Sequence, residues 1–477
     1  METLQRAANA GSVSTGNYEI DNSCKFEPDN SESMSRTPAG NGNLKTCTIS
    51  FWVKITELNK SHMFFTGDYG GASDPWFVIG IISDKIYISS TAGISGDSVV
   101  PSRLLRDTSA WYHLVFAFDT TQGTAADRIK IYVNGVQETV FTTTNYPSLN
   151  QDLDIMAAKA QGIAGYNDGT DYRFAGYMSE FVGIDGQALA PTEFGEFDAD
   201  SGIWKPIAVS GLTFGTNGFY LDFADSANLG NDASGGLDFT ETNIAAADQA
   251  TDTPTNNFCT INALVGTDST ISEGATKFKN HGANGWESFV ASMGAGTSGK
   301  WYAEFKFVDS DNDNMIGICP IDDPDLNRGF ATTFPYYGSD TSLDESVGYY
   351  GSDGNRFIGG GPSSYGNSYA RTNIVSIAVD MDNGKLYFAK DGVWQNSGDP
   401  TSGATGTGAL DVRGATKPQS LGAGVYYANE STLANYGGFT TISISSAASD
   451  ANGYGTFEYA PPTGYYALCT KNLAEYG

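Results

Sequence analysis

Apolar and polar side chains alternate along much of the chain, and this period of two restricts the possible folds more than any other feature of the sequence. In the segment WYHLVFAFD (residues 111–119), every second side chain is a leucine or an aromatic residue. Alternate side chains of an extended strand point to opposite faces, so one face of this segment is expected to lie in a hydrophobic core. The residues predicted to form that face are Tyr112, Leu114, Phe116 and Phe118.

The same alternation, closed by Gly, Asn or Asp turns, predicts strands in both halves of the chain. Asn134-Gly135 and Asp391-Gly392 tolerate positive φ angles, which indicates a β-hairpin at each pair. The composition agrees, because 58 glycines, 26 tyrosines and 27 phenylalanines are typical of turns and pleated strands. The predicted strands are 46–54, 62–66, 76–89, 110–120, 128–133 and 174–184 in the first half, and 300–307, 315–318, 373–380, 385–389 and 465–469 in the second.

A chain of 477 residues exceeds what a single hydrophobic core usually organises. Between residues 206 and 256 the alternation gives way to Gly, Ser, Asp and Asn, although 218–223 still has the pattern of a short strand. The sequence therefore predicts an all-β protein of two β-sandwich domains, 1–205 and 257–477, joined by a Gly/Asp/Ser-rich connector at 206–256.

The excess of acidic residues restricts the kinds of molecule that the protein can bind. With 26 basic against 55 acidic residues, the formal net charge is −29. Such a field repels phosphate backbones and anionic lipids, so neither nucleic acid nor membrane insertion is expected. The longest apolar run, 76–82, is much shorter than a membrane span, and the first residues, METLQR, lead into no apolar stretch of a signal peptide. Five scattered cysteines without a CxxC pair indicate buried thiols.

Several segments resemble known β-sandwich modules. Those similar to the laminin G-like (concanavalin A-like) module span residues 15–200 and are TISFWVK (48–54), AWYHLVF (110–116), IKIYVNG (129–135) and FAGYMSEF (174–181). Those similar to the SPRY domain span 257–470 and are SGKWYAE (298–304) and IAVDMDNGKLYF (377–388). The resemblance implies two concanavalin A-like jelly-roll sandwiches. Both folds are general binding platforms, so the fold alone implies no single function.

Three further segments extend the resemblance to a group of tailed-phage virion proteins that carry both modules. They are GQAL (186–189), GFYLDFADS (218–226) and SEG (272–274), in this order. The resemblance implies a fibre, tail or head-decorating component, made in the host cytoplasm and located in the virion, whose partners are other virion proteins. It also implies a homo-oligomer, a trimer if the protein is a fibre, with host-surface polysaccharide as a candidate ligand during adsorption.

The sequence is interpreted as that of a non-enzymatic protein. It holds no G-x-S-x-G motif and only three histidines. The concanavalin A-like fold also hosts glucanases, whose two carboxylates flank the scissile bond, and the nearest pattern here is Glu196, Asp198 and Asp200 on one face of an extended segment. A glycan-degrading enzyme is therefore the alternative function, and a cellular carbohydrate-binding adhesin is the third.

The segment DSDNDN (309–314) imitates the start of a calcium-binding loop, because alternate carboxylates can converge on a hard cation. The candidate Ca²⁺ ligands are Asp309, Asp311 and Asp313. Position six of the loop is Asn314 rather than Gly, and position twelve is Pro320 rather than Glu, so an acidic turn between strands is the alternative. No other cofactor is expected.

Tyrosines are interleaved with Gly, Ser, Asn and Asp between residues 336 and 369. Flat rings offer apolar stacking area for sugars, and neighbouring amides and carboxylates can bind sugar hydroxyls. This segment is the predicted glycan- or partner-binding surface; the alternative is that its tyrosines pack on the rim of the sandwich or against another subunit. The candidate residues are Tyr336, Tyr337, Tyr349, Tyr350, Tyr365 and Tyr369.

Overall fold

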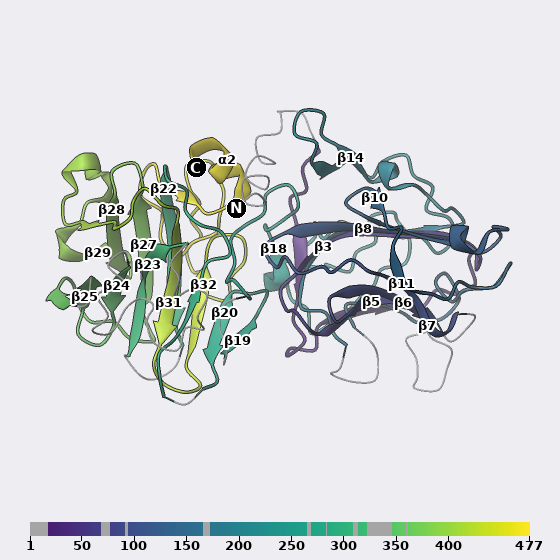
Figure 1. Cartoon of the computed structure of the whole chain (residues 1–477), viewed down its shortest axis with the longest axis horizontal. Coiled ribbons are helices and arrows are strands. Elements are labelled where there is room, and N and C mark those ends of the chain that lie inside the picture. The colour runs from purple at the N-terminus through teal and green to yellow at the C-terminus, as the bar shows by residue number, and fades with distance from the viewer. Residues whose placement is uncertain are drawn as a thin grey trace. The chain divides into compact units, whose positions relative to one another are not determined.

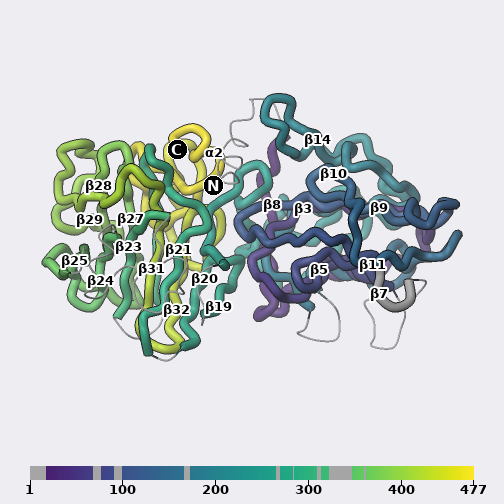
Figure 2. Tube along the Cα trace, viewed as in Figure 1, coloured from purple at the N-terminus to yellow at the C-terminus, as the bar shows by residue number. Residues whose placement is uncertain are grey.

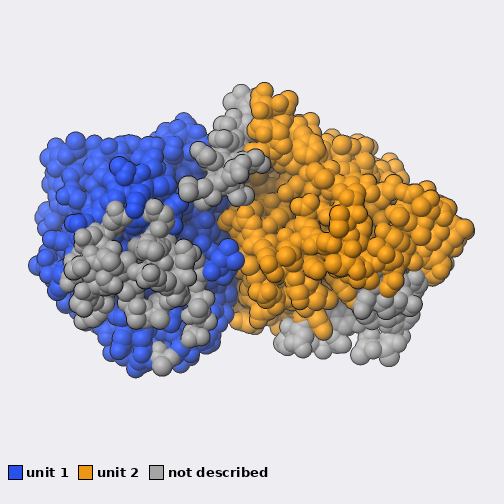
Figure 3. Space-filling model, viewed as in Figure 1, with its two compact units in different colours: residues 1–12, 256–477 blue, residues 13–255 orange. Residues whose placement is uncertain are grey.

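The computed structural model describes residues 18–67, 77–90, 94–165, 172–264, 269–282, 284–308, 313–321, 346–358 and 361–477. The described chain divides into two compact units, which we call the first sandwich (18–255) and the second sandwich (256–477), coloured separately in Figure 3. Each contains two large sheets of mainly antiparallel strands, which confirms the all-β sandwich prediction. Within these ranges, no helix has the length and apolar character needed to cross a membrane.

The first sandwich is built from two sheets. The first sheet runs β10 (Val136–Gln137), β9 (Ile129–Val133), β8 (Trp111–Asp119), β3 (Thr46–Ile55), β13 (Gly176–Asp185), β1 (Ser23–Phe26) and β18 (Gln249–Ala250), and β16 (Phe219–Leu221) also pairs with β13. The second runs β11 (Phe141–Thr144), β7 (Ile94–Pro101), β6 (Lys85–Ser90), β5 (Phe77–Ile82), β4 (Ser61–Gly67), β12 (Gln161–Ile163), β2 (Ser33–Arg36) and β17 (Thr240–Thr242). A separate hairpin joins β14 (Gly195–Phe197) to β15 (Trp204–Pro206).

The second sandwich, whose chain is traced from teal to yellow in Figure 2, also has two sheets. One runs β19 (Ser269–Ser272), β20 (Lys277–Asn280), β32 (Ser431–Asn435), β22 (Lys300–Phe307), β27 (Ile374–Asp380), β28 (Lys385–Lys390) and β29 (Val393–Trp394), with β30 (Leu410–Asp411) beside β28 and β33 (Tyr466–Ala467) beside β22. The other runs β21 (Glu287–Val290), β31 (Gln419–Val425), β23 (Asn314–Pro320), β24 (Val347–Tyr350), β25 (Asn355–Ile358) and β26 (Gly361–Ser364). The helices are α2 (Thr470–Tyr476) and the 3-10 turns η1 (Ala125–Asp127), η2 (Pro191–Glu193), η3 (Ala246–Asp248), η5 (Gln395–Ser397) and η6 (Pro400–Thr405).

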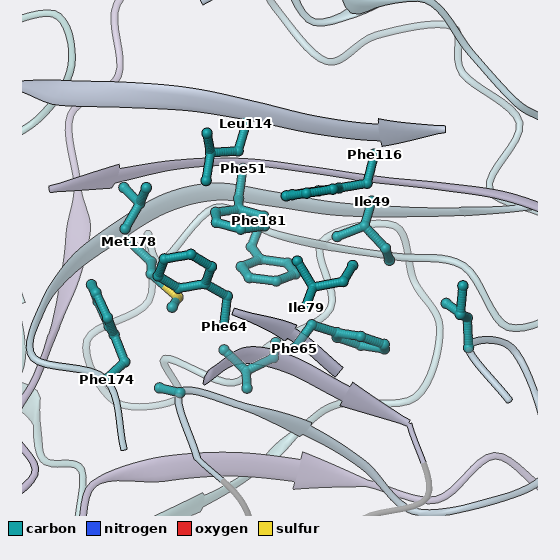
Figure 4. Packing of buried hydrophobic residues seen from close by; sticks show 14 of the residues in the cluster. Ile49, Phe51, Phe64, Phe65, Ile79, Leu114, Phe116, Phe174, Met178 and Phe181 are labelled. Carbon is teal, nitrogen blue, oxygen red and sulfur yellow. The ribbon is translucent and has the colours of Figure 1, made fainter. Parts of the chain in front are cut away.

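Aromatic side chains fill the core of the first sandwich (Figure 4). Phe51 of β3 stacks on Phe181 of β13 with ring centroids 4.6 Å apart, and it meets Phe64 of the opposite sheet edge-on at 5.2 Å. The face predicted for residues 111–119 is confirmed, because three of its four members are fully buried in this core and Tyr112 packs against it. All five cysteines of the chain are buried free thiols, as predicted.

The Asn-Gly turn forms the hairpin predicted for it, and the structure has one further hairpin that was not predicted. Asn134 and Gly135 adopt φ angles of 48° and 76° and close the predicted β9–β10 hairpin. The predicted single strand 76–89 is instead a hairpin of β5 and β6, because Ser83 and Asp84 take φ angles of 49° and 62° and reverse the chain between them.

The connector predicted at 206–256 is corrected by the structure, because this segment adds strands to the first sandwich. β16 pairs with β13, β17 with β2, and β18, teal in Figure 1, with β1 near the start of the chain. Phe219 and Leu221 enter the core, and Phe219 lies so close to Gly183 that a Cβ there would stand 2.3 Å from its ring. The chain therefore returns to complete both sheets before the second sandwich begins.

The aspartates that give the segment 206–256 the composition of a linker contact buried cations. Lys25, Arg36 and Lys54 are all buried in the first sandwich. The distances from each cation to its aspartate are 2.9 Å for Lys25–Asp248, 3.7 Å for Arg36–Asp232 and 2.7 Å for Lys54–Asp252. Buried charges are tolerated when they are paired, so these aspartates are part of the interior rather than a solvated tether.

Candidate functional site

The predicted tyrosine surface is contradicted at three of its positions. Tyr349, Tyr365 and Tyr369 lie in the core of the second sandwich, with exposures of 0%, 6% and 2%. The Tyr349 and Tyr369 rings are 4.9 Å apart, and the Tyr369 hydroxyl donates to the Tyr349 carbonyl at 2.6 Å. Glycine and tyrosine are common to loops and to strands, so the composition alone did not separate a binding loop from a core strand. These three rings have no face open to a sugar.

Tyr350 lies on the opposite face of β24, is only 9% exposed, and donates its hydroxyl to the Asp313 carboxylate. This bond and the packing of Tyr350 against Trp286 and Phe357 explain its burial, which contradicts its assignment as an open sugar platform. Four other candidates lie outside the described residues, namely Tyr336, Tyr337, Asp309 and Asp311. Over the described ranges, no group of three His, Cys, Asp or Glu side chains is placed to hold a metal ion.

The acidic segment at 196–200 forms part of the β14–β15 hairpin. The carboxylates of Glu196 and Asp198 lie 3.2 Å and 3.4 Å from the Lys205 ammonium. Asp198 also accepts hydrogen bonds from the Ser201 N–H and hydroxyl, both at 2.8 Å, and these bonds lower its pKa. The pair therefore holds a turn and a lysine, an arrangement that differs from two carboxylates facing a bound sugar.

His113 on β8 forms a hydrogen bond with a serine hydroxyl, and its two hydrogen bonds show which ring nitrogen carries the proton. The indole N–H of Trp204 donates to its Nδ1 at 3.0 Å, so that Nε2 carries the ring proton and donates to the Ser50 hydroxyl at 2.9 Å. A ring nitrogen that donates to the hydroxyl cannot also remove its proton. Complete burial lowers the pKa of His113 to about 3, and the contact with Ser50 is therefore structural.

Replacing Trp204 with phenylalanine is expected to lower the free energy of unfolding by about 1–2 kcal/mol, because the buried Nδ1 of His113 loses its donor.

The pH dependence of the stability should change as well. The folded pKa of His113 lies below its unfolded value, so stability is present above about pH 6.5 and is lost as the pH falls toward 3. The variant lacks the donor that favours the neutral ring, so it should lose less stability over this range. Urea unfolding at pH 7.5 and pH 4.5 measures both effects; equal losses in both proteins would contradict the assignment.

Glu180 of β13 is a buried carboxyl in an unusual backbone position. β13 pairs with β1 through residues 176–178 and with β16 through 181–183, so Glu180 stands where the partner strand changes. The pairing of β13 with β3 is also irregular here, and Glu180 has a φ of 49°. Non-glycine residues adopt such angles at a cost, which makes this position a candidate for a function.

Two tyrosine hydroxyls converge on Glu180, which is 6% exposed. Tyr220 of β16 donates to its Oε2 at 2.8 Å and Tyr18 donates to the same atom at 3.1 Å. Burial raises the pKa of Glu180 to about 7; the nearby Asp222 adds to the increase and the two hydroxyls oppose it. Glu180 was not among the predicted site residues, although a glutamate in the middle of the predicted strand 174–184 was a detectable sign.

The comparisons with known proteins support the fold. Residues 29–193 match the model of the concanavalin A-like lectin/glucanases superfamily (Laminin_G_3). No curated protein sequence gives a significant match.

Solved structures similar to the chain include a human SPRY domain, that of HERC1 (17% identity, 36% of this chain and 96% of that one, TM-score 0.27). Another is a Bacteroides ovatus protein provisionally assigned as carbohydrate-binding (16% identity, 47% of this chain and 59% of that one, TM-score 0.32). A third is a SAP-like pentraxin from Limulus polyphemus (16% identity, 36% of this chain and 80% of that one, TM-score 0.27). The residues matched by the family model, 29–193, lie within the first sandwich, whose two sheets are therefore similar to a laminin G-like, concanavalin A-like module.

Proposed function

We propose that the protein is a non-enzymatic structural component of a tailed-phage particle, either a fibre or a decoration protein, and that its first sandwich binds carbohydrate on the host surface. The observation that carries the carbohydrate part is the match of residues 29–193 to a superfamily of lectins and glucanases. The virion part is supported by the ordered segments 186–189, 218–226 and 272–274, which resemble phage virion proteins with both modules.

Two arrangements support binding without catalysis. The His113 ring donates to Ser50 and cannot act as its base. The acidic pair Glu196 and Asp198 is engaged by Lys205. Glycosidases need one carboxyl to protonate the leaving group and a second to act on the sugar from the opposite side. Here both carboxylates of the hairpin pair with the same lysine instead.

The purified protein is expected to bind polysaccharide and to release no reducing sugar from it. Binding would be measured by co-sedimentation with insoluble agarose and by calorimetry with laminarin, and turnover by a reducing-sugar assay on the same samples. The alternative, a glycan-degrading enzyme, is favoured by one observation, the raised pKa of Glu180, which suits a general acid. Turnover that is abolished by Glu180→Gln or Glu196→Gln would establish that alternative.

The location and assembly have separate tests. Mass spectrometry of purified particles should detect the chain among the virion proteins, and its absence would refute the virion part. Light scattering should show self-association; a monomer at every concentration would refute intrinsic assembly. A cellular adhesin, the third function considered, would instead be found on the surface of its own cell.

A further inference from the structure

The change of partner along β13 leaves a carboxyl oxygen of Glu180 available to a ligand. Both tyrosine hydroxyls donate to Oε2, and Oε1 receives no hydrogen bond from the described residues. The hydroxyl of the neighbouring Ser179 donates to the Asn22 carbonyl, so its proton is not available to Oε1 of Glu180. Glu180 is more than nine-tenths buried, and a strong acceptor held in such a place without a second donor is suited to bind one.

Aromatic rings stand beside this carboxyl. Tyr220 is stacked with Phe214, with centroids 6.4 Å apart and planes 13° from parallel, and both side chains are partly exposed. Tyr18 is partly exposed too, and its hydroxyl lies 3.4 Å from that of Tyr220. Flat rings next to a hydrogen-bonding carboxyl combine an apolar surface for the C–H face of a sugar with an acceptor for its hydroxyls.

The charge around Glu180 selects among sugars. The charged group that acts on it is Asp222, another acid, and no lysine or arginine of the described chain contributes. The whole chain carries a formal charge of −29. A carboxylate or sulfate on a ligand would meet repulsion at the site and in the surrounding field, whereas an uncharged sugar would not.

We propose that Glu180, Tyr18 and Tyr220 form a subsite for the hydroxyl groups of an uncharged saccharide. This assignment rests on the carbohydrate-binding function proposed above and adds its position and ligand class. The open Oε1 of Glu180 accepts a hydrogen bond from a sugar hydroxyl. The hydroxyls of the two tyrosines accept others while they donate to Oε2, and the Tyr220–Phe214 pair contacts the apolar face of the ring.

The test compares binding of laminarin and agarose oligosaccharides with binding of alginate, by calorimetry on the full chain. Glu180→Leu replaces the carboxyl with an apolar group and removes the acceptor, so it should weaken binding of the uncharged probes at least tenfold. Tyr18→Phe removes one hydroxyl from a partly exposed ring and should weaken binding about threefold or more. Glu193→Leu, at an exposed glutamate of the same sandwich, is the matched control and should leave binding unchanged. Thermal unfolding of each variant reports whether it is folded.

The outcomes separate this inference from the proposed function. Uncharged probes that bind the wild type, but bind Glu180→Leu and Tyr18→Phe equally well, would refute the subsite and leave carbohydrate binding intact. If Glu180→Leu does not fold, Tyr18→Phe alone decides in the same way. Tighter binding of alginate than of the uncharged probes would refute the ligand class. If no saccharide binds the wild type, the carbohydrate function fails and the subsite fails with it.

Discussion

Replacing Arg36 with alanine should lower the free energy of unfolding of the first sandwich by about 4 kcal/mol. The guanidinium is buried at the end of β2, and burial lowers the pKa of Arg36 to about 10. Its Nε donates to Gln161 at 2.8 Å, Nη1 donates to the Leu237 carbonyl at 3.2 Å, and Nη2 donates to the Asn217 carbonyl. Without it, three acceptors lose their donor, two of them in buried hydrogen bonds, and the Asp232 carboxylate loses its cation.

The Arg36 guanidinium also contacts two neighbouring phenylalanine rings, 4.5 Å from the centroid of Phe219 and 4.7 Å from that of Phe239. Both rings belong to the segment 206–255, so this side chain connects that segment to the early strands of the sandwich. A desolvated cation over aromatic faces adds stabilisation that a lysine, which lacks the planar fork, would only partly restore. Arg36→Lys should therefore fall between the wild type and Arg36→Ala.

The matched control is Arg128→Ala. Arg128 also donates three hydrogen bonds, in its case to the backbone carbonyls of Gln122, Gly123 and Pro147, but these bonds are largely exposed to solvent. Water can replace them, so the loss should stay below about 1 kcal/mol. Urea unfolding followed by tryptophan fluorescence would measure both variants. Similar losses of unfolding free energy for Arg36→Ala and Arg128→Ala would contradict the prediction that burial strengthens the contribution of the Arg36 contacts to stability.

Replacing Glu304 with alanine should destabilise the second sandwich by a similar amount, on the order of 4 kcal/mol. Glu304 is fully buried on β22. Its carboxyl accepts hydrogen bonds from the Tyr302 hydroxyl at 3.0 Å, the Asn435 amide at 3.2 Å, and the N–H groups of Glu458 and Tyr459 at 2.9 Å and 2.8 Å. Its removal leaves these donors without their acceptor and releases the late segment around 458 from the sheet.

Glu458→Ala provides the comparison for Glu304→Ala. The Glu458 carboxylate also accepts three hydrogen bonds, from the N–H and hydroxyl of Ser445 and the N–H of Ser446, but at an exposed site. Its replacement should shift the unfolding midpoint only slightly. Hydrogen exchange of the amides of 458 and 459 would locate the effect. Unchanged protection of these amides in Glu304→Ala would contradict the role given to this carboxyl.

The long strands could be predicted from the sequence because their information is local. In β8 and β22, alternation over eight or nine residues defines a buried face without reference to the partner strand. The strands β16, β17 and β18 have only two or three residues each, too few to show a period. Their pairing depends on partner strands that lie about 40 residues earlier for β16 and more than 200 residues earlier for β17 and β18. Composition therefore suggested a linker where the structure has a completed sheet.

The candidate site could not be predicted for a related reason. Tyr18, Glu180 and Tyr220 are far apart in the sequence, and of the three only Glu180, in the middle of a predicted strand, stands out in its own segment. They meet because β13 exchanges one partner for another at residue 180. The tyrosines around 349–369 showed the opposite error, since a composition typical of binding loops belonged to residues whose rings pack inside the second sandwich.

The first and last described segments of the first sandwich meet at Ile20 and Thr255, and this determines how the sandwich can be transferred between proteins. The Ile20 N–H donates to the Thr255 hydroxyl at 3.0 Å, and that hydroxyl donates back to the Ile20 carbonyl at the same distance. Entry and exit therefore lie side by side. A module with this property can be spliced into a surface loop of a host protein, or circularly permuted through a short bridge, without stretching its backbone.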